Sequence, residues 1–221
     1  AENVVMAAIR TGVKRVIALS TDKACNPVNL YGATKLAADK IFVAGNNLSG
    51  SEGPIFSVVR YGNVIGSRGS VVPLFKKLIV EGAEELPITD SRMTRFWITL
   101  DQGVTFVLSC LNSMEGGEIF VPKIPSMKIM ELAKCMAPDL EHREVGIRPG
   151  EKLHEVMISE DDARTTVEFY DRYAILAPFL NIHRIKKGAI EGKPVVAGFR
   201  YASDTNTDWL SPNEFLQILS M

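Results

Sequence analysis

The chain of 221 residues carries nearly balanced charge, with 25 lysines and arginines against 26 aspartates and glutamates. Its 46% hydrophobic and 23% charged residues indicate a soluble globular protein and exclude an intrinsically disordered one. The balanced charge argues against a basic nucleic-acid binder. No apolar run approaches the roughly 20 residues that are needed to cross a bilayer.

The cysteines and histidines indicate a reducing compartment and no metal site. The cysteines are odd in number and widely scattered, which argues against a disulfide framework: Cys25, Cys110 and Cys135. The histidines show no spacing typical of metal ligands: His142, His154 and His183. We therefore expect a cytoplasmic protein without a bound metal.

Hydrophobic periodicity, taken in chain order, predicts alternating helices and strands. Residues 2–11 repeat apolar side chains at helical spacing and end before Gly12, a typical helix C-cap. The run KRVIALS, residues 14–20, has the pattern of a buried parallel strand. The helices expected next cover residues 30–44, 72–80, 100–112 and 127–136, and the strands cover 55–60, 96–99 and 118–121. This alternation predicts an α/β fold with a mostly parallel sheet.

The alternation weakens from about residue 140 onward. Two further strands are expected, at residues 164–169 and 172–176. A last helix is expected after Ser211, because Ser-Pro supplies an N-cap and a proline in the first turn. This tail reads as a smaller lobe and not as an independent domain.

The most informative stretch is STDKACNPVNLYGATK, residues 20–35, which begins at the carboxyl end of a predicted strand. Ligands bind open α/β sheets at that edge. Tyr31 and Lys35 are four residues apart at the start of a helix, so they share one face. A lysine at that distance favours the phenolate, which can take a proton from an alcohol. A YxxxK pair alone is equally compatible with a solvated helix face, but the hydroxyl pair Ser20-Thr21 strengthens the catalytic interpretation.

These residues resemble the extended short-chain dehydrogenase/reductase family, and the full string is similar to the inverting UDP-N-acetylglucosamine 4,6-dehydratases. The resemblance covers essentially the whole chain. Further matching segments are RYGNVIGSRGSVVPLF at 60–75, MTRFWIT at 93–99, IRPGEKLHE at 147–155 and YASDTNTDWLS at 201–211. The resemblance implies a Rossmann-like parallel sheet with a smaller C-terminal substrate-binding lobe.

The triplet Thr21, Asp22 and Lys23 discriminates within this family. Relatives that dehydrate dTDP-glucose with retention at C5 have Thr-Asp-Glu, whereas the enzymes that invert C5 have Thr-Asp-Lys. A further feature is Tyr31, because the long membrane-anchored relatives commonly have methionine there. The resemblance is therefore to the short soluble subgroup.

The resemblance implies a hydro-lyase that uses NADP, with NAD as the alternative cofactor. Tyr31, assisted by Lys35, would remove the C4 hydroxyl proton while hydride passes to the nicotinamide, with Thr21 hydrogen-bonded to the same oxygen. The resulting 4-keto group acidifies the C5 hydrogen, which Lys23 would remove. Asp22 would protonate the departing C6 hydroxyl, and the hydride would return to C6. The expected product is a UDP-4-keto-6-deoxy-L-arabino-hexulose, a first step towards pseudaminic acid or a surface-polysaccharide sugar.

The resemblance also assigns binding residues. The cofactor residues are Leu19, Ser20, Tyr31, Lys35, Val64, Ile65, Gly66, Ser67 and Arg68. The substrate residues are Asn63, Val71, Thr89, Arg95, Arg148 and Glu151. Arg148 suits a diphosphate and Glu151 suits ribose hydroxyls, although each arginine is also compatible with a simple ion pair. The helix that carries Tyr31 and Lys35 commonly forms a dimer interface in this fold, so we expect a homo-oligomer.

No GxGxxG fingerprint occurs in the sequence, although the family places one after its first strand. KRVIALS corresponds to the fourth βαβ step of the family, so we expect roughly three units of about 30 residues before residue 1. Residues 1–139 would then be the C-terminal part of an NADP-binding domain with interleaved substrate-binding segments, and residues 140–221 mainly a substrate-binding lobe. The chain alone is expected to be inactive, with negligible NADP affinity.

Two other interpretations remain open at the level of sequence. The first is a catalytically silent fragment or nucleotide-sugar-binding module of the same fold. The second is a related UDP-sugar epimerase, which would not need the pair Asp22 and Lys23.

Overall fold

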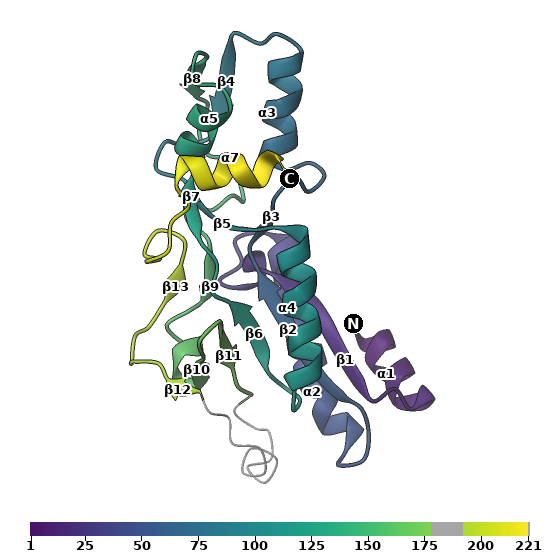
Figure 1. The fold of residues 1–221 in the computed structure, drawn as a ribbon. Coiled ribbons are helices and arrows are strands. Elements are labelled where there is room, and N and C mark those ends of the chain that lie inside the picture. The colour runs from purple at the N-terminus through teal and green to yellow at the C-terminus, as the bar shows by residue number, and fades with distance from the viewer. Residues whose placement is uncertain (178–191, 221) are drawn as a thin grey trace. The chain divides into compact units, whose positions relative to one another are not determined.

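The computed structural model describes residues 1–177 and 192–220, which leaves His183 outside the described part. The chain divides into two compact units, each assembled from three segments (Figure 1). Unit 1 is formed by Ala1–Tyr61, Val104–Lys123 and Val156–Tyr201, and unit 2 by Gly62–Gly103, Ile124–Glu155 and Ala202–Met221. Residues far apart in the sequence therefore belong to the same unit.

Unit 1 is built on a six-stranded mixed sheet. In spatial order its strands are β1 (Arg15–Thr21), β2 (Ile55–Tyr61), β6 (Ile119–Pro122), β11 (Arg172–Ile175), β10 (Thr166–Glu168) and β12 (Lys193–Pro194). β1, β2 and β6 run parallel, whereas the ladders from β6 to β12 are antiparallel. A separate short ladder joins β9 (Val156–Ile158) and β13 (Tyr201–Ala202).

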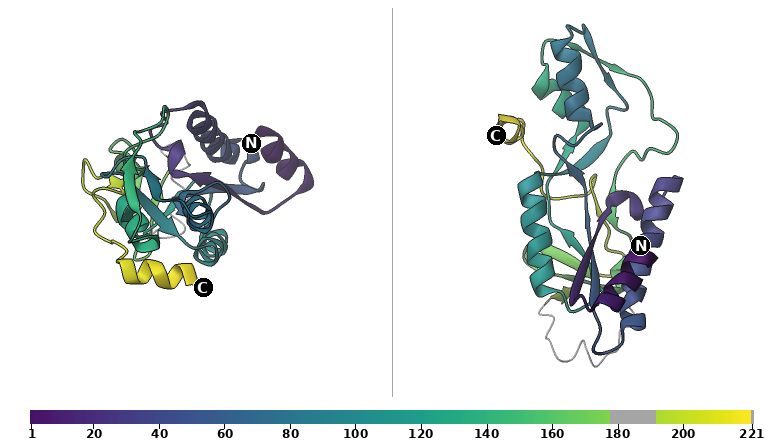
Figure 2. Two further views of the ribbon diagram at one scale, coloured as in Figure 1. Left: turned by 90° about the horizontal axis from the view of Figure 1, so that it is seen from above. Right: turned by 90° about the vertical axis from the view of Figure 1, so that its right-hand side faces the viewer.

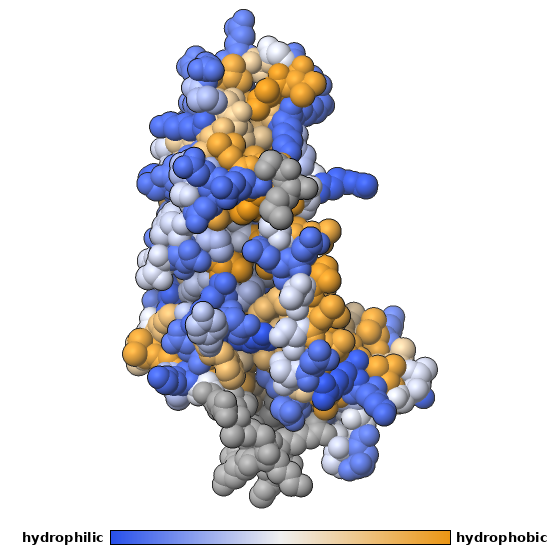
Figure 3. All heavy atoms as spheres, in the orientation of Figure 1, coloured by the Kyte–Doolittle hydropathy of each residue, from blue (hydrophilic) through white to orange (hydrophobic). Residues whose placement is uncertain are grey.

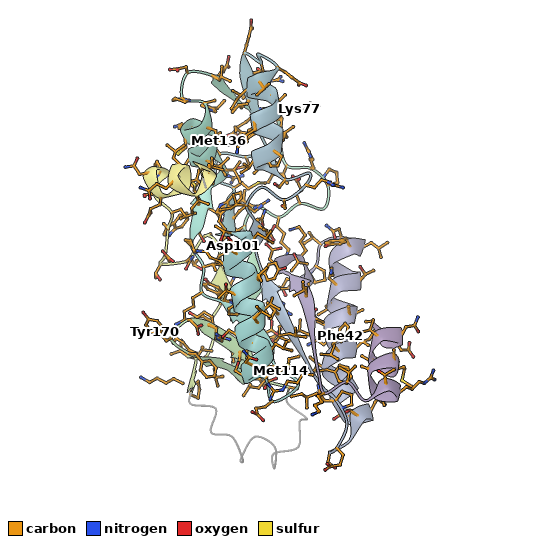
Figure 4. All side chains as sticks on the ribbon, turned by 45° about the vertical axis from the view of Figure 1, so that its right-hand side comes forward. Phe42, Lys77, Asp101, Met114, Met136 and Tyr170 are labelled. Carbon is orange, nitrogen blue, oxygen red and sulfur yellow. The ribbon has the colours of Figure 1, made fainter. Side chains whose placement is uncertain are left out.

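Helices cover both faces of this sheet. They are α1 (Glu2–Thr11), α2 (Leu30–Ser49) and α4 (Leu100–Ser113). Side chains alternate between the two faces along β2. Phe56 packs with Val5 of α1 and with Phe42 of α2. Phe42 is labelled in Figure 4. Val59 packs on the opposite face with Phe106 of α4. Figure 2 shows α4 on one side of the strands and α1 and α2 on the other.

The first strand is less buried than its sequence predicts. β1 is parallel to β2 as expected, but it lies at the edge of the described sheet. With a neighbour on one side only, Leu19 is 52% exposed, whereas Ser20 is buried. An apolar β-branched run predicts that a segment forms a strand in a parallel sheet. It does not predict whether the strand has a neighbour on one side or on both.

Unit 2 contains two small sheets and three helices. Its strands are β3 (Asn63–Val64), β5 (Thr94–Ile98) and β7 (Ser126–Lys128) in one sheet and β4 (Glu85–Ile88) and β8 (Glu141–Glu144) in the other. Its helices are α3 (Val71–Val80), α5 (Ile129–Met136) and α7 (Pro212–Ser220). The core lies around Trp97 and Phe215, whose rings meet edge to face with centroids 6.0 Å apart.

The capping predicted for the last helix is confirmed. The backbone N–H of Glu214 donates to Ser211 Oγ at 3.3 Å, and the backbone N–H of Ser211 donates to Glu214 Oε2 at 2.8 Å. This reciprocal arrangement is a capping box at the start of α7.

The long predicted elements are present, with shifted boundaries. The helix expected at residues 30–44 continues to Ser49, and the one expected at 127–136 begins at Ile129, because Met127 belongs to β7. The strand expected at 164–169 was wrong at its start, where the 3₁₀ helix η2 (Asp162–Thr165) precedes β10. Seven short strands of two to four residues were not predicted: β3, β4, β7, β8, β9, β12 and β13.

Apolar side chains are exposed along α4, where Leu100, Val104 and Leu108 form a stripe at four-residue spacing (Figure 3). Within the described residues, no helix combines the length and the hydropathy that a bilayer crossing requires.

Candidate active site

Strand β1 ends at Thr21, and the chain turns directly into the 3₁₀ helix η1 (Asp22–Ala24). Thr21 keeps an extended backbone, and its Oγ1 accepts the backbone N–H of Lys23 at 3.4 Å, which caps the turn. Thr21 pairs with Tyr61 at the end of the parallel strand β2. The triplet at residues 21–23 therefore lies at the carboxyl edge of the sheet, where α/β folds bind ligands.

Asp22 is the centre of a small hydrogen-bonded group. Its side chain is 0% exposed, and its Oδ1 accepts the Thr21 hydroxyl at 2.8 Å and Lys23 Nζ at 3.1 Å. The side chain of Lys23 is 40% exposed. A buried carboxylate thus holds the ammonium group of a partly exposed lysine, so Lys23 has more room to move towards a ligand than Asp22 has.

Helix α2 carries Tyr31 and Lys35 in its first turns. Asn29 caps the helix, since its Oδ1 accepts the backbone N–H of Gly32 at 2.8 Å. Tyr31 is 54% exposed, and Lys35 Nζ donates to the carbonyl oxygen of Leu19 at 3.5 Å. This contact ties the helix to the end of β1.

Gly32 allows the helix to pass close to the loop that holds Lys23. A Cβ at Gly32 would lie 2.3 Å from the carbonyl oxygen of Lys23 and 3.0 Å from Pro27 Cβ. No side chain fits there without moving the backbone. The glycine of the YxxxK segment therefore sets how closely α2 approaches η1.

In unit 2, Asn63 and Val64 form β3, and the next residues enter an exposed loop. Gly66 and Gly69 have φ of 75° and 76°, a conformation that favours glycine. Within the described residues, Asn63 Oδ1 is buried and has no hydrogen-bond partner. An acceptor in that state fits a ligand donor.

Arg95 lies on β5, and its guanidinium holds the backbone of residues 152 and 153 within the segment IRPGEKLHE. Its Nη1 donates to the carbonyl oxygen of Leu153 at 3.1 Å, and its Nη2 donates to that of Lys152 at 3.0 Å. Arg95 Nε lies 3.6 Å from Glu155 Oε1. These contacts favour a positioning role for Arg95, and its predicted contact with a diphosphate stays a prediction.

The remaining predicted substrate residues lie at several places in unit 2. Val71 begins α3 and is partly buried against the core, and Thr89 directly follows β4. Arg148 and Glu151 share an exposed turn, in which the backbone N–H of Glu151 donates to the carbonyl oxygen of Arg148 at 3.1 Å. The backbone N–H of Arg148 donates to Glu151 Oε2 at 3.4 Å.

Each unit therefore contains a distinct part of the predicted set. Unit 1 contains the five predicted catalytic residues together with Leu19 and Ser20, and unit 2 contains the others. Sequence reasoning missed three buried charged residues in unit 1, Asp39, Arg60 and Glu118. Only Asp39 had a signal in the sequence, because it lies one turn beyond Lys35 on the helix face that carries Tyr31.

Comparison with known proteins gives the family. Residues 1–177 match the family model described as polysaccharide biosynthesis protein. Two relatives from Campylobacter jejuni subsp. jejuni, of serotypes O:2 and O:23/36, are both named UDP-N-acetylglucosamine 4,6-dehydratase (inverting). Each is 59% identical over 225 residues, which cover 100% of this chain and 67% of the relative. A UDP-glucose 4-epimerase of Rickettsia canadensis is 37% identical over 223 residues, an alignment that covers 99% of this chain and 65% of the relative.

Solved structures agree on the fold. The X-ray structure of Pen from Bacillus thuringiensis matches with a TM-score of 0.85 and 34% identity, over 99% of this chain and 65% of that one. The dTDP-glucose 4,6-dehydratase DesIV from Streptomyces venezuelae matches with a TM-score of 0.61 and 22% identity, over 69% of this chain and 53% of that one. At that identity the second match supports the fold alone.

The chain belongs to the polysaccharide biosynthesis protein family. The resemblance to inverting UDP-N-acetylglucosamine 4,6-dehydratases and the predicted Rossmann-like α/β fold are both confirmed. The chain spans about two thirds of the length of the relatives that it matches.

Proposed function

We propose that the protein containing this chain removes water across C5 and C6 of UDP-N-acetylglucosamine and inverts C5. The observation that carries this proposal is the hydrogen-bonded group of Thr21, Asp22 and Lys23 at the end of β1, beside the helix with Tyr31 and Lys35. Relatives at 59% identity that are named as inverting dehydratases support it.

Oxidation at C4 needs a base for the hydroxyl proton. Tyr31 is half exposed and can reach a ligand, and Lys35 places a positive charge one turn further along the same helix face. The Thr21 hydroxyl donates a hydrogen bond to Asp22 Oδ1. Its single hydrogen must leave this bond before it can bond the sugar oxygen, which couples the two residues.

Elimination needs a base for the C5 proton and an acid for the C6 oxygen. Lys23 and Asp22 can supply them, since Lys23 Nζ lies 3.1 Å from Asp22 Oδ1. Transfer of one proton from Nζ to Oδ1 converts the ion pair into a neutral amine and a carboxylic acid. Removal of water from the site favours this neutral pair, because burial penalises charge. Lys23 then takes the C5 proton, and Asp22 gives its proton to the C6 oxygen, which leaves as water. The ion pair is restored, and C5 then takes a proton from water on the opposite face, which inverts that centre.

A nicotinamide dinucleotide, when bound, would accept hydrogen from C4 and return it to C6. The residues of unit 1 fit such a group: Leu19 is exposed at the end of β1, and the Lys35 ammonium beside it can donate to ribose hydroxyls. The exposed loop of unit 2 at residues 64–68 is the second proposed contact. NADP is the proposed form.

The proposed contacts of the substrate lie in unit 2. The buried acceptor Asn63 Oδ1 suits a donor on the sugar. Arg148 and Glu151 suit the diphosphate and the ribose of UDP, respectively. Val71 and Thr89 line the proposed pocket, and Arg95 supports the segment that follows Arg148 and Glu151.

We further propose a cytoplasmic homo-oligomer that feeds a pseudaminic acid or polysaccharide pathway. Leu30, Ile41 and Leu48 of α2 are exposed apolar side chains and support assembly through this helix. The cytoplasmic location rests on the scattered cysteines.

The experiment that tests this function is incubation of the full-length protein with UDP-N-acetylglucosamine, followed by NMR of the product. We expect a 4-keto-6-deoxy sugar. Formation of the C4 epimer without loss of water would favour the epimerase alternative. Binding of the nucleotide sugar without any product would favour a silent binding module.

A further inference from the structure

A hydrogen-bonded network in the interior of unit 2 centres on the hydroxyl of Thr94. Thr94 lies on β5 and is 2% exposed, and Ser203 is fully buried. Thr94 Oγ1 lies 2.8 Å from His154 Nδ1 and 2.7 Å from Ser203 Oγ. Ser203 Oγ also accepts the backbone N–H of Glu155 at 2.9 Å. Three segments that are far apart in the sequence therefore meet at one buried hydroxyl.

The chemistry of a hydroxyl lets Thr94 serve both side-chain contacts at the same time. A hydroxyl has one hydrogen to donate and two lone pairs that accept. Thr94 can donate to His154 and accept from Ser203, or it can accept from the imidazole and donate to Ser203. A serine hydroxyl could do the same, whereas a valine of nearly the same shape as threonine could do neither. The hydroxyl of Thr94 is therefore the link between its two partners.

The network holds one short piece of chain, residues 152–155. The backbone N–H of Thr94 donates to the carbonyl oxygen of Leu153 at 3.2 Å, and the backbone N–H of Ser203 donates to that of Glu155 at 2.8 Å. The guanidinium of Arg95 donates to the carbonyl oxygens of residues 152 and 153. Neighbouring residues of β5 and one residue after β13 thus fix this piece through both backbone and side chains.

This piece anchors the C-terminal end of the turn that carries Arg148 and Glu151. The N-terminal end of the turn is anchored after β8, where the backbone N–H of Val145 donates to the carbonyl oxygen of Ile88 at 2.8 Å. Between the two anchors the chain is mostly exposed to solvent. An exposed turn gains little order from packing, so the direction of its side chains depends on where its two ends are fixed.

A buried polar network is costly when one of its members lacks a partner, and an apolar interior carries no such cost. What a satisfied network supplies is one specified arrangement of the chain. Its three side chains come from three of the segments that carry the family resemblance, at residues 93–99, 147–155 and 201–211. The network therefore connects motifs that the proposed chemistry leaves largely unexplained.

We propose that Thr94 is a positioning residue, which through His154 and Ser203 fixes the turn at residues 146–151 for binding of the diphosphate and ribose of UDP. Thr94 would not touch the nucleotide itself, since it acts on the anchor of the turn. The part of this inference that concerns UDP rests on the proposed function.

The test compares wild type with Thr94→Val and Thr94→Ser in the full-length protein. Calorimetry gives Kd for UDP, and steady-state kinetics gives KM and kcat for UDP-N-acetylglucosamine. We expect Kd and KM to rise about fivefold or more in Thr94→Val with kcat within about twofold, because contacts with UDP act equally in the ground state and the transition state. Thr94→Ser keeps the hydroxyl, so all three constants should stay within about twofold of wild type.

Thr99→Val is the matched control for a loss of stability. Thr99 Oγ1 accepts the backbone N–H of Gln102 at 3.2 Å at the start of α4, so the same substitution removes a helix cap there. We expect its urea midpoint to fall while Kd and KM keep their wild-type values. A rise of Kd in Thr99→Val equal to that in Thr94→Val would show that lost stability alone weakens binding, and it would overturn the proposal.

Thr94→Val leaves buried polar groups short of a partner and can fail to fold. His154→Ala removes the same bond from a partly exposed position and should raise Kd for UDP about threefold or more. The double variant Thr94→Val/His154→Ala should bind UDP no more weakly than Thr94→Val, since the two changes remove one shared bond. A wild-type Kd in either folded single variant would overturn the proposal.

A measurement without ligand separates this inference from the proposed function. The amide of Glu155 donates to Ser203 Oγ, so hydrogen exchange of the peptide with residues 152–155, followed by mass spectrometry, reports whether the anchor is fixed. We expect exchange about threefold faster or more in Thr94→Val and the wild-type rate in Thr94→Ser. Unchanged exchange in Thr94→Val would overturn the role of Thr94. If the wild-type protein binds no UDP, the proposed function fails, and exchange still decides whether Thr94 fixes the anchor.

Discussion

Lys23 Nζ lies 3.1 Å from Asp22 Oδ1, the oxygen that also accepts the Thr21 hydroxyl. The proposed acid and the proposed base are thus neighbours in the sequence and share one contact. Asp22 is buried and Lys23 is 40% exposed, so the proposed acid is fixed and the proposed base can move. This difference leads to separate predictions for the two residues.

Lys23→Met should stop the reaction after oxidation at C4, because no group remains to take the C5 proton. We expect dehydration to fall about 10²- to 10⁴-fold with KM for the nucleotide sugar nearly unchanged. Substrate recovered from deuterated water should carry no deuterium at C5 by NMR. Lys76→Met, at an exposed position of α3, is the control and should keep wild-type activity. Retention of half the activity in Lys23→Met would rule out Lys23 as the base.

Asp22→Asn should stop both proton removal and water loss. The amide oxygen can still accept hydrogen bonds from Thr21 and Lys23, but the side chain can neither take the Nζ proton of Lys23 nor protonate the C6 oxygen. We expect dehydration to fall about 10²-fold or more, and recovered substrate should gain little deuterium at C5. Wild-type deuterium exchange at C5 in a folded variant would show that Lys23 becomes neutral without Asp22.

Gly32→Ala should destabilise unit 1, because the new Cβ would lie 2.3 Å from the carbonyl oxygen of Lys23. We expect the free energy of unfolding to fall by about 1–3 kcal/mol in urea denaturation. Gly103→Ala is the matched control, since a Cβ there would meet no atom within 4 Å outside the neighbouring backbone of its own helix. In a helix that change should add about 0.5–1 kcal/mol. Equal effects of the two substitutions would contradict the close approach of α2 to η1.

Asp90 gives unit 2 a defined response to acid. Hydrogen bonds from Arg92 lower the pKa of Asp90 from 3.8 to about 2. Because the folded-state pKa is depressed, this stabilisation is present above about pH 4 and is lost as the pH falls to about 2. The urea midpoint of wild type should therefore drop more steeply than that of Asp90→Asn between about pH 4 and pH 2. Parallel curves for the two proteins would show that the pair does not contribute.

Local patterns predicted the long elements because their signals lie within each segment. Gly12 has φ of 69° at the end of α1, as a helix C-cap requires, and the run at residues 14–20 does pair in parallel. The exposure of Leu19 could not be predicted, because it depends on the neighbours of a strand and not on the strand itself.

The candidate site was predictable only where its residues are close in sequence. Residues 21–35 carry the triplet, the helix cap and the YxxxK pair in one stretch. The buried pair of Asp39 and Arg60 joins residues 21 positions apart, and its contact exists only after α2 packs on β2. The use of Arg95 to hold backbone carbonyl oxygens was hidden for the same reason, since its partners lie 57 and 58 residues away.

One measurement tests the central claim most directly: conversion of UDP-N-acetylglucosamine by the full-length protein in deuterated water, with the product examined by NMR. The account predicts a 4-keto-6-deoxy sugar with deuterium at C5 and inverted configuration there. A folded protein with bound nicotinamide cofactor that yields a product with retained C5 configuration, or no 4-keto product at all, would contradict it.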